Sequence, residues 1–244
     1  LVKMETDDVA AITTDQISAL KTAQIAALTS DQVLTLSTDQ LSELKTSQIA
    51  ALTTANLAKL TTDQFSVFDT AQIAAMTTAQ VVAMTTDQVS TLSTDQLSSL
   101  TTAQLVKMET DDFAAITTDQ IGVITPTELR ALTAQQLLNL TTTNLAALTA
   151  SKVGTLQATQ ISGMGTANAA ALTTDQIGSL TTAQVSALTY DQVRAMSATQ
   201  IQALSSTNLD ALSAKQLSSL TTSAIQGIST SNMPTLSAAQ IAGL

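Results

Sequence analysis

The chain has 244 residues and a formal net charge of -10, with no Cys, His or Trp, one Tyr and three Phe. Its 9 Lys and Arg residues form no basic cluster, which argues against nucleic acid as a partner, because phosphates require cationic side chains. Without Cys and His, the usual nucleophilic triads and the usual zinc sites cannot be built.

Membrane insertion is also excluded by the distribution of apolar residues. Thr or Ser interrupts the apolar residues every few positions, so no run approaches the roughly 18 residues of a membrane span. The few aromatic residues indicate a narrow, regular core that is filled by aliphatic side chains.

An eight-residue repeat runs through the chain without an insertion, and a repeat at a fixed period indicates a repeat architecture. Counting from Leu1, position one of this octad is large and apolar in 30 of 31 copies, the exception being Ala169. Position four is apolar in all 31 copies. The predicted core consists of these two positions and is represented by Ile17, Leu20, Ile25, Leu28, Ile73, Leu100, Leu148 and Leu188.

Two polar positions of the octad predict how each helix begins. Position five is Ser or Thr in 23 of 30 copies, and position eight is Gln or Glu in 21 of 30. This spacing is that of a capping box, in which the hydroxyl and the Gln or Glu side chain each bond to the other residue's backbone N–H. In residues 13–20, Thr13 and Gln16 are the predicted cap residues, and each octad is expected to form one helix of about six residues.

Several copies depart from this pattern. Lys21 and Lys45 stand at the cap position, where a start shifted by one residue to Thr22 or Thr46 is an alternative. Thr125 and Glu128 form a capping box around Pro126, which falls at the first helical position, where its missing N–H is not needed.

Two further departures lie towards the end of the chain. Gly163, Gly165 and Ala169 predict a soft or kinked coil over residues 163–170, although Gly is tolerated as a cap. Pro234 falls in mid-helix, where it removes a backbone donor.

The octads are expected to stack into an all-α solenoid with three or four octads per turn. One continuous helix is rejected, because eight residues at 100° each would turn the apolar pair by about 80° per octad around the helix axis. A β-solenoid remains the alternative, although apolar residues three and then five apart do not fit the two-residue period of a strand. Short helices need such stacking, since nucleation outweighs their few hydrogen bonds.

Two acidic motifs are the strongest candidates for a metal site. Glu5-Thr6-Asp7-Asp8 and Glu109-Thr110-Asp111-Asp112 offer oxygen ligands of the kind that calcium prefers. A solvated helix N-terminus explains them better, because the helix dipole favours acidic residues there. We therefore predict no metal, no cofactor, no small-molecule substrate and no catalytic residue.

Octads such as Leu-Thr-Thr-Asp-Gln-Ile and Ala-Leu-Thr-Thr-Ala-Gln-Val resemble the degenerate tandem repeats of very large bacterial surface and adhesin-like proteins. The resemblance implies an extracellular or cell-surface location and a stalk or filament role. It carries over no binding residue.

The unbroken register of the octads and the absence of catalytic or ligand-binding motifs together predict a non-enzymatic structural protein, namely an extracellular stalk or spacer. A self-assembling filament subunit, whose partner is a further copy of the chain, is the alternative, and an ice-binding or ligand-binding solenoid is favoured less. Residues 1–244 are expected to be one continuous array and a segment of a longer one, because the octad pattern is present at both ends.

Overall fold

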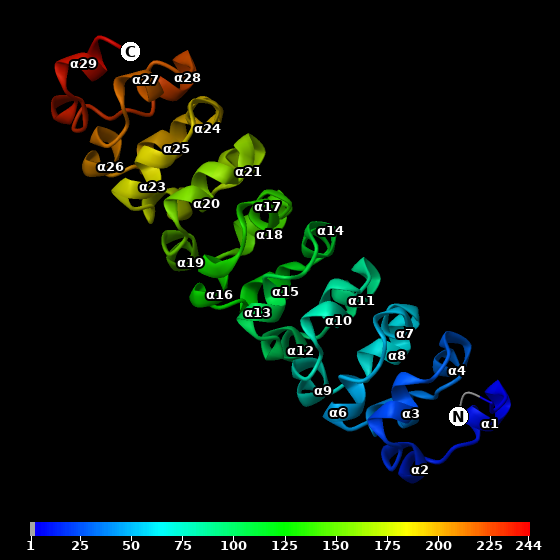
Figure 1. The fold of residues 1–244 in the computed structure, drawn as a ribbon. Helices are drawn as coiled ribbons and strands as arrows, with labels where there is room; N and C mark the ends of the chain where they lie inside the picture. Colours follow the sequence, from blue (N-terminus) through cyan, green and yellow to red (C-terminus); the bar gives the residue numbers. More distant parts are fainter. Residues whose placement is uncertain (1–2) are drawn as a thin grey trace. The chain divides into compact units, whose positions relative to one another are not determined.

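The structure, a computed structural model, describes residues 3–244 and divides into two compact units, residues 1–123 (unit 1) and 124–244 (unit 2). All regular structure in the described residues is helical, as predicted, and the β-solenoid alternative is wrong. Each octad contributes one short helix (Figure 1).

The helices of unit 1 are 4 to 6 residues long and begin at eight-residue intervals. They are α1 (Thr6–Ala10), α2 (Thr14–Ser18), α3 (Thr22–Ala26), α4 (Ser30–Leu34), α5 (Thr38–Ser42), α6 (Thr46–Ile49), α7 (Thr54–Lys59), α8 (Thr62–Ser66), α9 (Thr70–Ala74), α10 (Thr78–Val82), α11 (Thr86–Thr91), α12 (Thr94–Ser99), α13 (Thr102–Leu105), α14 (Thr110–Ala114) and α15 (Thr118–Val123).

The α-helices of unit 2 are 4 to 7 residues long, and one octad forms a short 3-10 helix, η1. They are α16 (Pro126–Ala131), α17 (Ala134–Leu138), α18 (Thr142–Ala147), α19 (Ala150–Gly154), α20 (Ala158–Gly163), α21 (Gly165–Ala171), α22 (Thr174–Gly178), α23 (Thr182–Ala187), α24 (Tyr190–Ala195), α25 (Ala198–Ala203), α26 (Ser206–Asp210), α27 (Ala214–Leu217), α28 (Thr222–Ile225), η1 (Met233–Thr235) and α29 (Ala238–Ile241).

Two extended residues, at positions four and five of the octad, separate consecutive helices. At the end of α23, Leu188 has φ -54° and ψ 135°, and the next residue, Thr189, has φ -75° and ψ 161° as the N-cap of α24. The Thr189 hydroxyl then accepts a hydrogen bond from the Gln192 backbone N–H at 3.2 Å. Most helices are therefore followed by a large apolar residue at position four, and the next helix begins after a hydroxyl cap at position five.

Within each unit the chain winds so that a helix packs against the third helix that follows it. In unit 1, α1 packs against α4, α2 against α5 and α3 against α6, and in unit 2 α20 packs against α23 and α21 against α24 (Figure 1). Hydrogen bonds from position eight also connect most helices to the fourth helix before them. One turn therefore contains between three and four octads, as predicted.

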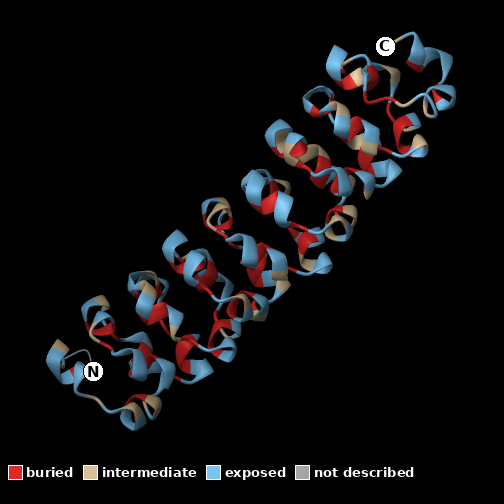
Figure 2. Cartoon of the chain, turned by 180° about the vertical axis from the view of Figure 1, so that it is seen from behind, coloured by how far each residue is buried: buried red, intermediate tan, exposed pale blue. Residues whose placement is uncertain are grey.

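The side chains at positions one and four face the interior of each unit, where buried residues follow the inner side of the coil (Figure 2). Seven of the eight predicted core residues are buried: Ile17, Ile25, Leu28, Ile73, Leu100, Leu148 and Leu188. Leu20, which was predicted to be buried in the core, is only half-buried. It lies in the first turn of unit 1, and no earlier described turn covers it.

The Lys residues at cap positions do not displace the helix start. Lys21 remains the N-cap of α3, and Lys45 that of α6. The Gln24 backbone N–H donates to the Lys21 carbonyl oxygen at 2.8 Å, which replaces the missing hydroxyl acceptor. The alternative start at Thr22 or Thr46 is therefore wrong.

The remaining departures have local structural consequences. Pro126 is the first residue of α16, as predicted. Gly165 has a φ of +81°, a left-handed conformation that favours Gly, and it begins α21 directly after Met164 without a hydroxyl cap. Pro234 lies in η1, because a residue without an N–H and with a fixed φ interrupts the regular α-helix of its octad.

Candidate functional site

The side chain at position eight bonds in two directions at once. In unit 1 the Gln48 Oε1 atom accepts from the backbone N–H of Lys45 at 2.7 Å, which is the local half of a capping box. Its Nε2 atom donates to the carbonyl oxygens of Ile17 at 2.8 Å and Leu20 at 2.9 Å. Gln48 is 1% exposed, so these bonds lie inside the coil.

This arrangement recurs along both units, and we call it the glutamine ladder. Each Nε2 or Nδ2 atom donates to carbonyl oxygens 28 to 31 residues earlier. Except for Gln32, which bonds to Met4 before α1, these carbonyls lie at the C-terminal end of the fourth helix before the donor's own. The glutamine ladder contains Gln32, Gln40, Gln48, Asn56, Gln64, Gln72, Gln80, Gln88, Gln96, Gln104 and Gln120 in unit 1, and Gln160, Asn168, Gln176, Gln184, Gln192, Gln200, Asn208, Gln216 and Gln240 in unit 2.

The chemistry of helix ends explains the choice of glutamine. The last carbonyl groups of a helix have no partner within that helix, and a buried carbonyl without a hydrogen bond costs free energy. An amide side chain supplies an acceptor for its own helix start and a donor for another helix end, whereas a carboxylate supplies only acceptors. The glutamine ladder therefore pairs the ends of helices that lie on successive turns.

The sequence contains a signal for this ladder that the capping-box interpretation did not use. A capping box accepts Gln and Glu equally, but position eight has 20 Gln and only one Glu, Glu128. The preference indicates that a donor is needed in addition to the acceptor. The capping box accounts for the Oε1 atom of the amide group, which accepts a hydrogen bond, but it gives the NH2 group no role.

The predicted cap residues form the bonds expected of them. The Thr13 N–H donates to Gln16 Oε1 at 2.9 Å, and the Gln16 N–H donates to Thr13 Oγ1 at 3.3 Å. The Thr125 N–H donates to Glu128 Oε2 at 2.8 Å, and the Glu128 N–H donates to Thr125 Oγ1 at 3.3 Å. Gln16 is exposed and Glu128 half-buried, whereas the members of the glutamine ladder are buried.

Asp112 is a buried carboxyl group at position eight of unit 1. It is 5% exposed, and burial raises the pKa of Asp112 to about 6, with smaller contributions from the nearby carboxylates of Glu109 and Asp111. The acidic motif of residues 109–112 therefore contains a group that resists ionisation. In the other motif, the Glu5 N–H donates to Asp8 Oδ2 at 3.3 Å, as expected of a helix start.

The described residues offer neither a metal-binding cluster nor a membrane-spanning helix. Residues 3–244 contain no group of three or more acidic side chains arranged to hold a metal ion. None of the helices in this range is long and apolar enough to span a bilayer.

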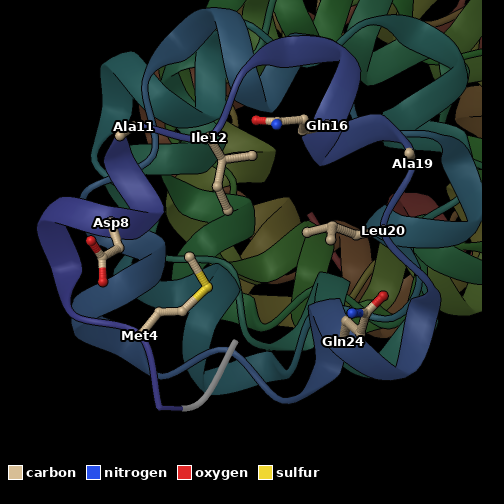
Figure 3. Close-up of a pocket in the computed structure, with 8 residues that line it drawn as sticks. All are labelled: Met4, Asp8, Ala11, Ile12, Gln16, Ala19, Leu20 and Gln24. Carbon is tan, nitrogen blue, oxygen red and sulfur yellow. The ribbon is translucent and has the colours of Figure 1, made fainter.

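An open groove of about 570 Å³ lies at the first turn of unit 1. The position-four side chains Met4, Ile12 and Leu20 converge on it, and the amide groups of Gln16 and Gln24 lie at its margin (Figure 3). These two glutamines form the local capping bonds but belong to a turn with no earlier described turn to bond to. The groove therefore shows the kind of interior surface that, elsewhere in the described residues, faces the preceding turn.

The comparison with known families agrees with the repeat seen in the structure. A family model described as the ALTTAQ repeat matches residues 1–38, 57–94, 65–102, 93–126 and 185–222. The search among curated proteins gives no match to the chain. Because the matched stretches together cover more than half of the 244 residues, the chain belongs to the ALTTAQ repeat family.

Proposed function

We propose that this chain is a non-enzymatic structural element, an extracellular stalk or spacer in a surface protein. The observation that carries the proposal is the glutamine ladder, which bonds the helix ends of successive turns at most octads of both units. In such a repeat, stability is a sum of contributions from neighbouring turns and does not depend on one central core. A spacer can therefore gain length by adding octads without a new fold.

The bacterial surface location and the adhesin-like role rest on the resemblance of the octads to repeats of large surface proteins. Immunolabelling of intact and permeabilised cells of the source organism tests the location. Labelling that requires permeabilisation would contradict the extracellular assignment.

The spacer role predicts a characteristic response to stretching. Each turn holds 28 to 31 residues between bonded atoms, so the loss of one turn should release about 100 Å of chain at roughly 3.3–3.6 Å per residue. Single-molecule force spectroscopy is expected to show repeated small extensions of this size. One all-or-none rupture of the whole chain would contradict the proposal.

Variants of the glutamine ladder provide a matched control for that experiment. Replacement of Gln48, Gln72 and Gln80 by Glu removes donors between turns and should lower the unfolding force of unit 1. Replacement of Gln16 and Gln24 by Glu keeps the same change of charge per residue but removes no bond between turns, and should leave the force nearly unchanged.

The second candidate is a self-assembling filament subunit, in which the partner is a further copy of the chain. The turns of each unit are joined by the same recurring side-chain bonds and apolar positions, so a further copy can continue the coil by the same contacts. Electron microscopy and sedimentation over a range of concentrations distinguish the candidates. A spacer stays monomeric, whereas a filament subunit forms ordered polymers as the concentration rises.

A further inference from the structure

The only tyrosine of the chain marks a departure from the repeat in unit 2. Tyr190 occupies position six, where every other octad has Thr, Ser, Ala or Pro. It is the first residue of α24 and is 46% exposed. A large exposed aromatic ring contributes nothing to a core that is formed by positions one and four, so the repeat itself does not explain it.

Winding of the chain brings two unusual basic residues to the same place. The Lys215 Nζ atom lies over the Tyr190 ring, 4.8 Å from its centroid, although the residues are 25 positions apart. Lys215 is the only basic residue at position seven in any octad. Arg194, one turn of helix after Tyr190, lines the same surface. Three non-repeat side chains therefore form one cluster between α24 and α27 (Figure 1).

Two open grooves follow one another along the seam between these turns, and both are lined by Tyr190. The first, of about 550 Å³, lies between residues 186–190 and 211–216. The second, of about 520 Å³, lies between residues 190–194 and 218–222 and is lined by Asp191, Arg194 and four hydroxyl side chains, Ser218, Ser219, Thr221 and Thr222. We call this surface the Tyr190 seam.

The backbone on both sides of the seam is held in place. Ser219 Oγ donates to the Tyr190 carbonyl oxygen at 3.1 Å, and Gln216 Nε2 donates to the Leu188 carbonyl oxygen at 2.7 Å. Ser186 Oγ donates to the Ala211 carbonyl oxygen at 3.2 Å. A ligand would therefore meet a surface that is already organised, which lowers the entropy lost on binding.

Charge favours an anionic ligand at this surface. The acidic excess of the whole chain lies in unit 1, because residues 124–244 contain four acidic and four basic residues (Glu128, Asp175, Asp191 and Asp210; Arg130, Lys152, Arg194 and Lys215). Two of those four basic residues, Arg194 and Lys215, are in the cluster, and one acidic residue, Asp191, lines the second groove beside Arg194. Arg pairs with planar carboxylates through two parallel hydrogen bonds.

We propose that the Tyr190 seam binds an oligosaccharide that carries carboxylate groups. The apolar face of a sugar ring packs on Tyr190, Arg194 pairs with a carboxylate of the ligand, and sugar hydroxyls bond to Asp191 and to the Ser and Thr side chains of the second groove. Lys215, which lies over one face of the Tyr190 ring, helps to hold that ring in place and adds positive charge. A hydroxyl-lined groove with one aromatic ring suits a polyhydroxylated chain better than an apolar peptide, and this site goes beyond the spacer function.

Titration calorimetry with the full chain tests the proposal. The probes are a galacturonic acid hexasaccharide and, for comparison, a neutral cellulose hexasaccharide. The acidic probe is expected to bind at low salt and to weaken as salt increases. Arg194→Ser and Tyr190→Thr, which restore residues common at these positions, should each weaken binding at least about tenfold.

The matched control is Arg130→Ser, which removes the same charge at the same octad position on α16. It should leave the affinity unchanged, and circular dichroism of all variants reports whether the fold is kept. Equal affinity for the neutral probe would overturn the assignment of an acidic ligand. Absence of binding at low salt, or equal losses in Arg194→Ser and Arg130→Ser, would overturn the site.

Discussion

The amide nitrogen of Gln48 lies 2.8 Å from the carbonyl oxygen of Ile17, thirty-one residues earlier in the chain. The same side chain accepts a hydrogen bond from Lys45 at the start of its own helix. One residue thus links the beginning of α6 to the end of α2. Because this link recurs in successive octads, each turn of a unit is bonded to the one before it.

The donor half of this link can be removed while its acceptor half is kept. Gln48→Glu should destabilise unit 1 by about 1–3 kcal/mol, since it removes the NH2 donor and places a carboxylate beside buried carbonyl oxygens. Hydrogen–deuterium exchange of the amides in α2 and α6, together with the denaturant midpoint, measures the loss. Gln16→Glu is the control, because Gln16 is exposed and bonds only within its own capping box. Equal effects of the two substitutions would refute the role of the donor.

The buried carboxyl group of Asp112 predicts a dependence of stability on pH. Its pKa is about 6 in the folded chain, against 3.8 when unperturbed, so the folded state binds more protons than the unfolded state between these values. The free energy of unfolding should therefore fall as the pH rises from about 4 to about 6 and then level off for this group.

The substitution Asp112→Gln should remove that contribution. It replaces the carboxyl group with the amide that this position usually has, so the variant should be more stable than the parent above pH 6. The measurement is the difference in melting temperature between variant and parent at several pH values, which cancels the titration of all other groups. A difference that does not grow as the pH rises would contradict the prediction.

Close approach of successive turns requires glycine at residue 227 of unit 2. A Cβ atom on Gly227 would collide with the backbone carbonyl of Ala198, whereas a Cβ atom on Gly178 would meet the Ala203 carbonyl oxygen at an ordinary 3.5 Å. Gly227→Ala should therefore destabilise unit 2. Gly178→Ala should be neutral or stabilise by up to about 1 kcal/mol, because Ala has the better helix propensity. Denaturant unfolding of both variants tests the pair, and a stable Gly227→Ala protein would contradict this packing.

Two adjacent threonines, Thr181 and Thr182, allow the effect of the helix cap on stability to be measured separately from the effect of helix propensity. Thr181 accepts from the Gln184 N–H at 3.3 Å, whereas Thr182 is exposed at the first helical position. Thr181→Ala should cost about 1 kcal/mol, and Thr182→Ala should be neutral or slightly stabilising. Thermal melts of the two single variants provide the comparison. A larger loss in Thr182→Ala would show that the cap lies elsewhere.

Much of the local structure was readable from the residues alone. Thr13 and Gln16, like Thr125 and Glu128, interact across three residues, so their spacing in the chain was enough to place the helix starts. Ile17 and Leu28 were recognisable as core residues because they hold the two apolar positions of an unbroken octad. Leu20 shares the pattern but not the burial, since burial depends on whether another turn covers it.

Relationships between turns could be read only from the tertiary structure. The extended residues between helices, such as Leu188 and Thr189, set the angle at which one helix follows another, and small dihedral differences there decide how many octads complete a turn. That number determines which carbonyl a glutamine such as Gln48 reaches, and it brings Lys215 over Tyr190. Sequence alone determined the octad, its caps and its apolar positions, because these depend on neighbours along the chain. The winding of the helices decided the glutamine ladder and the Tyr190 seam, because both join residues about one turn apart.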